Sequence, residues 1–297
     1  MIGTNYLVRA TAMDGRVRAF ALDASEVVAV LQHRHDTYPA VTAALGRTAM
    51  GALLLAAAAL KEEDQILTID VRGGGPAGRI LCTANGRGEV RGLVSNPHAH
   101  AESVREGKLN VAGVVGTGGY ISVTKDLGMR EPYQGVTELQ SGEIGEDIAY
   151  YLGQSEQKPS AVGVGVFVRG DGSVDAAGGF LLQLLPGLAD EEISSIESEV
   201  AALPHPTTLL REGTTPEGIL ARIFPGGYEE LDRYGVRFHC PCSRERFESA
   251  IVSLGSEEVG RIIEEEEKQM TEVVCHFCNE AYHFSPEQML EIQRAAR

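Results

Sequence analysis

Four cysteines near the C-terminus stand in two close pairs whose spacing is typical of a metal site. Cys240 and Cys242 form a Cys-x-Cys pair, Cys275 and Cys278 form a Cys-x-x-Cys pair, and 32 residues separate the two. Such a pair forms a tight turn, here called a knuckle, whose sulfurs point the same way, and two knuckles can close a tetrahedron with Zn–S distances of about 2.3 Å. The spacing therefore predicts one Zn²⁺ per chain, bound by Cys240, Cys242, Cys275 and Cys278.

Three histidines lie near these pairs in the sequence and compete as ligands. They are His239, His276 and His283. Because a structural zinc site is complete with four ligands, we favour an all-cysteine shell over a shell of three cysteines and one histidine. The interval between the pairs is longer than the roughly 20 residues of common zinc ribbons. We therefore expect a folded segment to fill it.

A four-cysteine site has two possible uses here, as a structural staple or as a redox sensor. A module of about 60 residues seldom derives more than ~3–5 kcal/mol from its own core, whereas a structural zinc contributes an apparent ~10–16 kcal/mol. Loss of the metal should therefore unfold the module. Oxidation can cause that loss, because each close pair can form its own disulfide and a thiolate in a disulfide no longer serves as a ligand.

Composition and charge indicate a globular cytoplasmic protein that does not bind nucleic acid. The chain has 297 residues, of which 43% are hydrophobic, and a net charge of −16. Its N-terminus has no secretory pattern, and its longest apolar run, residues 50–60, is too short to span a bilayer. From Gly235 onward, seven Lys and Arg stand against twelve Glu, the wrong balance for neutralising phosphates. In a reducing cytosol, paired cysteines indicate metal or redox chemistry rather than structural disulfides.

The first part of the chain, residues 1–186, is predicted to be a mixed α/β domain with an antiparallel sheet, in a protein of the α+β class. A hairpin is expected within residues 10–28, followed by a long buried helix that Asp36 or Thr37 caps and that ends near residue 61. The remaining predicted elements are a meander of strands at 65–71, 79–84 and 88–94, a strand at 120–124, a helix at 143–154, and strands at 161–168 and 175–185. Cys82 is expected to be a small buried hydrophobe in the second of the meander strands.

A linker at residues 187–234 and a zinc module at residues 235–297 are predicted to follow. The linker carries amphipathic helices at 189–203 and from Thr215, as cap, to about 224. Short helices depend on what they pack against, which makes the linker a candidate switch. In the module we expect helices at 243–254 and 256–268, an extended segment at 281–284, and a final helix that opens with a capping box at residues 285–288.

No motif in the chain indicates an enzyme. Residues 73–78 match G-x-G-x-x-G, but the segment after them reads as a strand, whereas a dinucleotide site needs a helix there. The patterns G-x-S-x-G, H-E-x-x-H and the P-loop do not occur, and His98 and His100 read as loop residues. A chain of this kind is predicted to be neither an enzyme nor an ATP-binding protein.

The residues around the cysteines resemble those of a known family. The first pair lies in FHCPCSRER at 238–246 and the second in CHFCN at 275–279, with Tyr282 and Phe284 after it. Upstream matches are ALGR at 44–47, GP at 75–76, VRG at 90–92, GTG at 116–118, PYQG at 132–135, SEQ at 155–157, GGF at 178–180 and LPG at 185–187. Over nearly its whole length the chain closely resembles the redox-regulated 33 kDa heat-shock chaperones, the 33 kDa chaperonins.

That resemblance implies an ATP-independent holdase, a stress-response chaperone that keeps unfolding client proteins from aggregating until they refold. Such a protein is inactive while reduced and zinc-bound. Oxidation would form the disulfides Cys240–Cys242 and Cys275–Cys278, release zinc, and unfold the module and the linker. The active form would be a homodimer.

Overall fold

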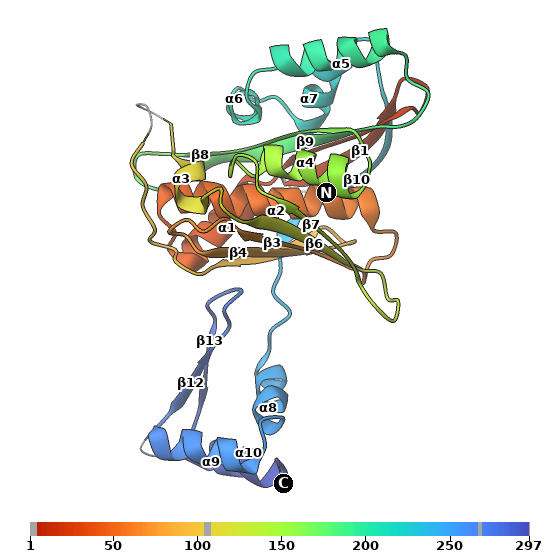
Figure 1. Cartoon of the computed structure of the whole chain (residues 1–297). Coiled ribbons are helices and arrows are strands. Elements are labelled where there is room, and N and C mark those ends of the chain that lie inside the picture. The colour runs from red at the N-terminus through yellow and green to blue at the C-terminus, as the bar shows by residue number, and fades with distance from the viewer. Residues whose placement is uncertain (1–4, 104–107, 267–268, 297) are drawn as a thin grey trace. The chain divides into compact units, whose positions relative to one another are not determined.

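The computed structural model describes residues 5–103, 108–266 and 269–296. The chain divides into two compact units, Met1–His239 and Cys240–Arg297, and each is described by itself. The first unit contains two sheets and several helices, and the second contains short helices with a two-stranded sheet (Figure 1). The predicted α+β class with antiparallel sheets is confirmed.

One sheet of the first unit, here called sheet A, has five antiparallel strands in the order β10-β1-β2-β9-β8. The hairpin between β1 and β2 turns at Met13 and Asp14, both in the left-handed region with φ of 51° and 54°. The strands are β1 (Tyr6–Ala12), β2 (Val17–Asp23), β8 (Ser160–Val168), β9 (Val174–Leu184) and β10 (Glu229–Gly235). The predicted strands at 161–168 and 175–185 are confirmed, whereas β10 falls in the segment predicted to be a helical linker.

The other sheet, sheet B, has the order β11-β5-β4-β3-β6-β7 and contains the predicted meander. All its pairs are antiparallel except β11 with β5. Residues 73–78 lead directly into β4, as expected for a segment that does not open a helix. The strands are β3 (Ile66–Arg72), β4 (Arg79–Asn85), β5 (Glu89–Val94), β6 (Tyr120–Asp126), β7 (Tyr133–Glu138) and β11 (Arg237–Phe238). Strand β7 was not predicted.

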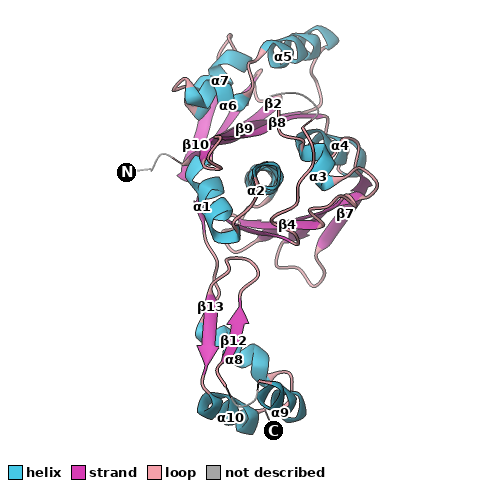
Figure 2. Ribbon diagram, turned by 90° about the vertical axis from the view of Figure 1, so that its left-hand side faces the viewer, coloured by secondary structure: helices cyan, strands magenta, loops and turns pink. Residues whose placement is uncertain are grey.

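The long helix α2 (Pro39–Ala59) lies between the two sheets and is seen end-on in Figure 2. Residues 40–57 are buried except Arg47. With 21 residues, α2 is long and apolar enough to cross a membrane, but 94% of its most apolar window is buried inside the protein, so it is the core helix of this unit. The expected cap was wrong: Tyr38 is the N-cap, because Asp36, at φ 49°, instead ends the unpredicted helix α1 (Ser25–His35).

Shorter helices cover the remaining surfaces of the first unit. Helices α3 (Val111–Val115) and α4 (Gly145–Ser155) lie beside α2 (Figure 2). The outer face of sheet A is covered by α5 (Asp190–Ala202), α6 (Pro206–Arg211) and α7 (Pro216–Ile223). Their buried side chains, among them Ile196, Leu209 and Ile219, pack with Val8, Ala19 and other outward-facing residues of the sheet. Thr215 caps α7 as predicted, accepting a hydrogen bond from the Gly218 N–H at 3.3 Å. The division at residues 186 and 234 stays a prediction.

The second unit has a small core of its own. Its elements are α8 (Arg244–Val252), α9 (Ser256–Glu265), β12 (Thr271–Val274), β13 (Ala281–Phe284) and α10 (Pro286–Ala295). Ser285 and Gln288 form the predicted capping box of α10. The predicted end of α9 at Lys268 lies outside the described residues. The core consists of Ile251, Val259, Ile263, Phe284, Met289 and Ile292, which is a modest amount of apolar burial for an independent unit.

Candidate metal centre

The second knuckle is the loop of a β-hairpin. Strands β12 and β13 pair from Thr271↔Phe284 to Val274↔Ala281, and the loop between them carries Cys275 and Cys278. The Cys275 carbonyl accepts the N–H of Cys278 at 3.2 Å and of Asn279 at 2.7 Å, while the Cys275 N–H donates to the Glu280 carbonyl at 2.9 Å. Asn279 adopts φ 55°, a left-handed conformation that Asn tolerates better than most residues. The turn is thereby tight enough to direct both sulfurs to one side.

The first knuckle is held by the helix that follows it. Ser243 is the N-cap of α8 and accepts a hydrogen bond from the Arg246 N–H. The Arg244 guanidinium donates to the His283 carbonyl and to the Gln288 side chain, each at 2.8 Å, and lies over the Phe284 ring. These contacts tie the start of α8 to β13 and α10, so Cys240 and Cys242 are brought to the hairpin loop.

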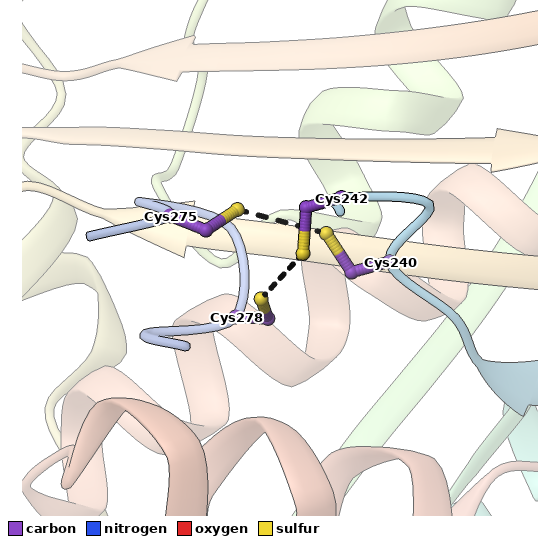
Figure 3. A group of neighbouring side chains, drawn as sticks. All are labelled: Cys240, Cys242, Cys275 and Cys278. Carbon is purple, nitrogen blue, oxygen red and sulfur yellow. Dashed lines mark hydrogen bonds between the residues drawn. The ribbon is translucent and has the colours of Figure 1, made fainter. Parts of the chain in front are cut away.

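The structure brings all four predicted sulfurs together (Figure 3). They lie within 4.8 Å of one another, with 3.7 Å between the Sγ atoms of Cys240 and Cys275 and 3.3 Å between those of Cys242 and Cys278. A tetrahedron with metal–sulfur distances of about 2.3 Å places its sulfurs about 3.8 Å apart. The four cysteines therefore fit a metal ion of that coordination.

Because the cluster is largely buried, negative charge on its thiolates is unfavourable unless a cation is present. Cys275 and Cys278 are only 6% and 3% exposed, and Cys240 and Cys242 are half-buried. Burial raises the pKa of the Cys275 and Cys278 thiols, and the hydrogen bonds from the backbone of Phe277 and Glu280, respectively, oppose that rise. Four thiolates at these separations repel one another, so a cation is what would stabilise them together.

A tyrosine that the sequence patterns did not assign to the site contacts it. The Tyr282 hydroxyl donates to the Cys242 Sγ at 3.3 Å, and this hydrogen bond, with burial, raises the pKa of Tyr282. Its ring packs on Phe247 of α8 with a centroid distance of 4.9 Å. The extended pattern of residues 281–284 predicts a strand, but nothing in the sequence indicates which sulfur the hydroxyl would reach.

The three histidines weighed as ligands, and the fifth cysteine, do not belong to the four-sulfur group. The side chains of His239, His276 and His283 are exposed, and His283 Nδ1 is 3.6 Å from Glu272. Cys82 is fully buried in β4, where its thiol lies 3.8 Å from the Leu45 carbonyl and burial raises its pKa. The prediction that Cys82 is a small buried hydrophobe is confirmed.

Comparison with known proteins gives consistent matches along the chain. A family model described as Hsp33 protein matches residues 5–285. The "33 kDa chaperonin" of Bacillus subtilis is 50% identical over 285 residues, covering 96% of this chain and 97% of that protein. The "33 kDa chaperonin" of Bacillus velezensis is 48% identical over 289 residues, covering 97% and 98%. The crystal structure of a 33 kDa chaperonin from Thermotoga maritima superposes with a TM-score of 0.90 at 34% identity and covers 98% of each chain.

Proposed function

Because this chain belongs to the Hsp33 family of chaperones, which are not enzymes, we propose that it is a redox-switched, ATP-independent holdase. In its resting state it would be reduced, metal-bound and inactive. Under oxidative stress it would bind unfolding client proteins and hold them until they can refold. The observation that carries this proposal is the cluster of four sulfurs within 4.8 Å, since the same atoms that fit a metal ion are the atoms an oxidant would consume.

In the resting state, one Zn²⁺ would be bound by Cys240, Cys242, Cys275 and Cys278. When bound, zinc would hold the four sulfurs as thiolates at the centre of the unit and shield them from casual oxidation. The sulfur separations support this assignment, as does an all-thiol donor set, which suits zinc. The Tyr282 hydroxyl and the backbone N–H groups of Phe277 and Glu280 would orient the sulfurs and offset part of their charge.

Oxidation by hydrogen peroxide would convert each knuckle into a disulfide. The Cys275 thiolate attacks one peroxide oxygen, which gives a sulfenic acid and, after protonation of the departing hydroxide, one water. The Cys278 thiolate then attacks the sulfenic sulfur, forms the S–S bond and displaces hydroxide, which takes a proton from solvent and becomes the second water. Two sulfurs lose two electrons in all, and the two peroxide oxygens gain them. Cys240 and Cys242 would react in the same way with a second peroxide.

Each disulfide consumes two ligands, so the unit Cys240–Arg297 would lose most of its stability. Its own core of six buried apolar residues is small, and a structural metal contributes far more than such a core does. The linker, residues 187–234, would then be released as the second element of the switch. Helices α5, α6 and α7 cover an apolar face of sheet A, and their release would expose a surface able to bind apolar client segments.

Three further properties belong to the proposal. The active form is a homodimer, because dimerisation would join two client-binding surfaces. The protein works in the cytoplasm, where thiols stay reduced in the absence of stress. Its trigger is chemical, so it uses no nucleotide, and its net charge of −16 would keep the opened state soluble and away from nucleic acid.

The test compares reduced, zinc-loaded protein with peroxide-treated protein in a light-scattering assay of an aggregating client. Zinc release is followed in parallel with a chromogenic chelator, and disulfides are mapped by mass spectrometry of peptides. We expect suppression of aggregation only after oxidation, in proportion to released zinc, with Cys240–Cys242 and Cys275–Cys278 as the linked pairs.

The matched control is Cys82→Ala, which removes the remaining, fully buried thiol and should leave the redox response unchanged. Equal suppression of aggregation by the reduced and oxidised forms, or zinc retained after oxidation, would mean that the four cysteines form a structural staple and not a redox switch.

A further inference from the structure

One segment of the first unit supplies an edge strand to both sheets. Residues 229–238, here called the edge segment, form β10 on the edge of sheet A beside β1 and then β11 on the edge of sheet B beside β5. The chain passes from one sheet to the other within a single residue, Val236, whose N–H donates to the Asn5 carbonyl at 3.1 Å. The edge segment thus protects two sheet edges that would otherwise be open.

The second half of the edge segment inserts alternate side chains into the main core. Val236 is 4% exposed, and Tyr234 and Phe238 pack against the same core cluster, while Gly235 and Arg237 face outward. The Arg34 guanidinium lies 5.2 Å from the centre of the Phe238 ring. Such alternation is that of an extended strand with one buried face. The site beneath is therefore shaped for large apolar side chains at every second position.

Main-chain contacts hold the edge segment in register. The Arg237 N–H donates to the Gly88 carbonyl and the His239 N–H to the Val90 carbonyl, each at 3.0 Å. Gly88, at φ 80°, permits the close approach, because a Cβ there would lie 2.6 Å from the Gly235 carbonyl oxygen. Backbone hydrogen bonds are the same for every non-proline sequence, so these edges would accept many strands.

Ion pairs of different burial join the edge segment to its neighbours. Arg9 lies 3.9 Å from Asp232, Arg233 lies 2.5 Å from Glu217, and Arg237, itself 71% exposed, lies 2.5 Å from Glu89. The Arg9–Asp232 pair has the most exposed carboxylate and is the longest, and such a pair contributes about 0–1 kcal/mol, whereas the carboxylates of Glu217 and Glu89 are only 19% and 9% exposed. Strand β11 is two residues long and ends at Phe238, two residues before Cys240. Unfolding of the unit that begins at Cys240 would remove the constraint on its outgoing end.

We propose that the edges of β1 and β5 form a binding site for an extended polypeptide with apolar side chains at alternate positions, and that the edge segment occupies this site as an internal mimic in the resting protein. The inference rests on the proposed function and names the client chemistry that it would recognise: unfolded chain, paired through its backbone and anchored by side chains like those of Tyr234, Val236 and Phe238. Exposed edges are a ready template for an added strand.

The first experiment uses the full chain and a synthetic peptide of residues 229–238, labelled with fluorescein and carrying a photoreactive group in place of the exposed Leu231. We expect the oxidised protein to bind it at least about tenfold more tightly than the reduced protein, because the internal segment competes in the resting state. Photo-crosslinks should map to both β1 and β5. A peptide with Ser in place of Tyr234, Val236 and Phe238 should not bind.

The second experiment opens the site without oxidation. In reductant, Val236→Asp should bind the labelled peptide while retaining its zinc, because a buried carboxylate expels the edge segment from the core. Leu231→Asp introduces the same charge into the same segment at a side chain that is 58% exposed, and should behave as wild type. If Val236→Asp fails to fold, competition decides the question: the unlabelled peptide should displace a bound client from oxidised wild type.

The outcomes separate this inference from the proposed function. Suppression of aggregation by oxidised wild type, together with absent peptide binding or crosslinks confined to the outer face of sheet A, would overturn the edge site and leave the holdase function standing. Peptide binding at β1 and β5 without suppression would support the site and reject the holdase. Peptide binding that blocks only self-association, with clients undisplaced, would show that a second copy fills the edges and would overturn the inference.

Discussion

At the residue scale, the hydroxyl of Tyr282 is a side-chain group that joins the sulfur cluster to the packing of the surrounding unit. It donates to Cys242, and its ring rests on Phe247. A hydrogen bond to a metal ligand orients that ligand and adjusts its charge. The ring and the hydroxyl therefore have separable roles, since the ring packs on Phe247 of α8 whether or not the hydroxyl is present.

Tyr282→Phe removes the hydroxyl and keeps the ring. We expect zinc affinity to fall by about tenfold, the lower end of the usual effect of such partners, with the thermal stability of the metal-loaded protein nearly unchanged. The measurement is competition with a chromogenic chelator in reductant. Tyr228→Phe is the matched control, because its hydroxyl donates to the Glu217 carbonyl in the other unit. Equal affinities for wild type and Tyr282→Phe would assign the hydroxyl no role at the metal.

At the scale of elements, the carboxylate of Glu156 joins the end of α4 to strand β6. Glu156, whose side chain is 6% exposed, is bound by the ammonium groups of Lys125 and Lys158 and by the Tyr151 hydroxyl. Burial alone would raise the pKa of Glu156, but the hydrogen bonds from Lys125 and Lys158 outweigh it and lower the pKa below its ordinary value of 4.5. The folded protein therefore binds this proton less readily than the unfolded chain.

A carboxyl whose pKa is lowered by folding stabilises the folded protein at pH values above its ordinary pKa. The folded protein loses this stabilisation as the pH falls from the ordinary pKa through the lower pKa of the folded state. Wild type should therefore lose this stability as the pH falls below the ordinary carboxyl pKa of 4.5. Glu156→Gln should lose about 3 kcal/mol at pH 7, because Lys125 stays buried without its partner, and should show a shallower acid dependence. Urea unfolding across this pH range measures both. Glu146→Gln, an exposed position on the same helix, is the control, and identical acid dependence in all three proteins would contradict the assignment.

At the scale of the whole molecule, the two compact units depend on different sources of stability. The unit Met1–His239 has a core built around α2 and both sheets. The unit Cys240–Arg297 has six buried apolar residues and the four sulfurs. A metal that binds the folded state alone stabilises only the unit that holds its ligands.

Removal of the metal should unfold one unit and leave the other folded. With a strong chelator in reductant, or in Cys275→Ser/Cys278→Ser, we expect loss of the helical signal of α8, α9 and α10 and a single remaining calorimetric transition from Met1–His239. Circular dichroism and calorimetry, with bound zinc measured in the same samples, test this. Cys82→Ala should keep both transitions. A double variant with full zinc occupancy would exclude Cys275 and Cys278 as ligands.

Elements with local signals could be predicted from the sequence. The cap at Thr215, the capping box of Ser285 and Gln288, and the meander of β3, β4 and β5 are confirmed, because a cap or a short hairpin is decided within a few residues. Strand β10 could not be predicted, since its exposed, acidic sequence has no apolar alternation. It is a strand because the edge of β1 is there to pair with it.

By itself, the sequence determined the chemistry available to this protein: four cysteines at knuckle spacing, an apolar helix, and a family pattern along nearly the whole chain. Only the tertiary structure decided that the four sulfurs lie within 4.8 Å of one another, that Tyr282 reaches Cys242, and that residues 229–238 cover an edge of each sheet. The physical reason is the distance along the chain over which each interaction acts. Covalent spacing and local hydrogen bonds are written into neighbouring residues, whereas strand pairing and side-chain contact between distant segments depend on where the rest of the chain has folded.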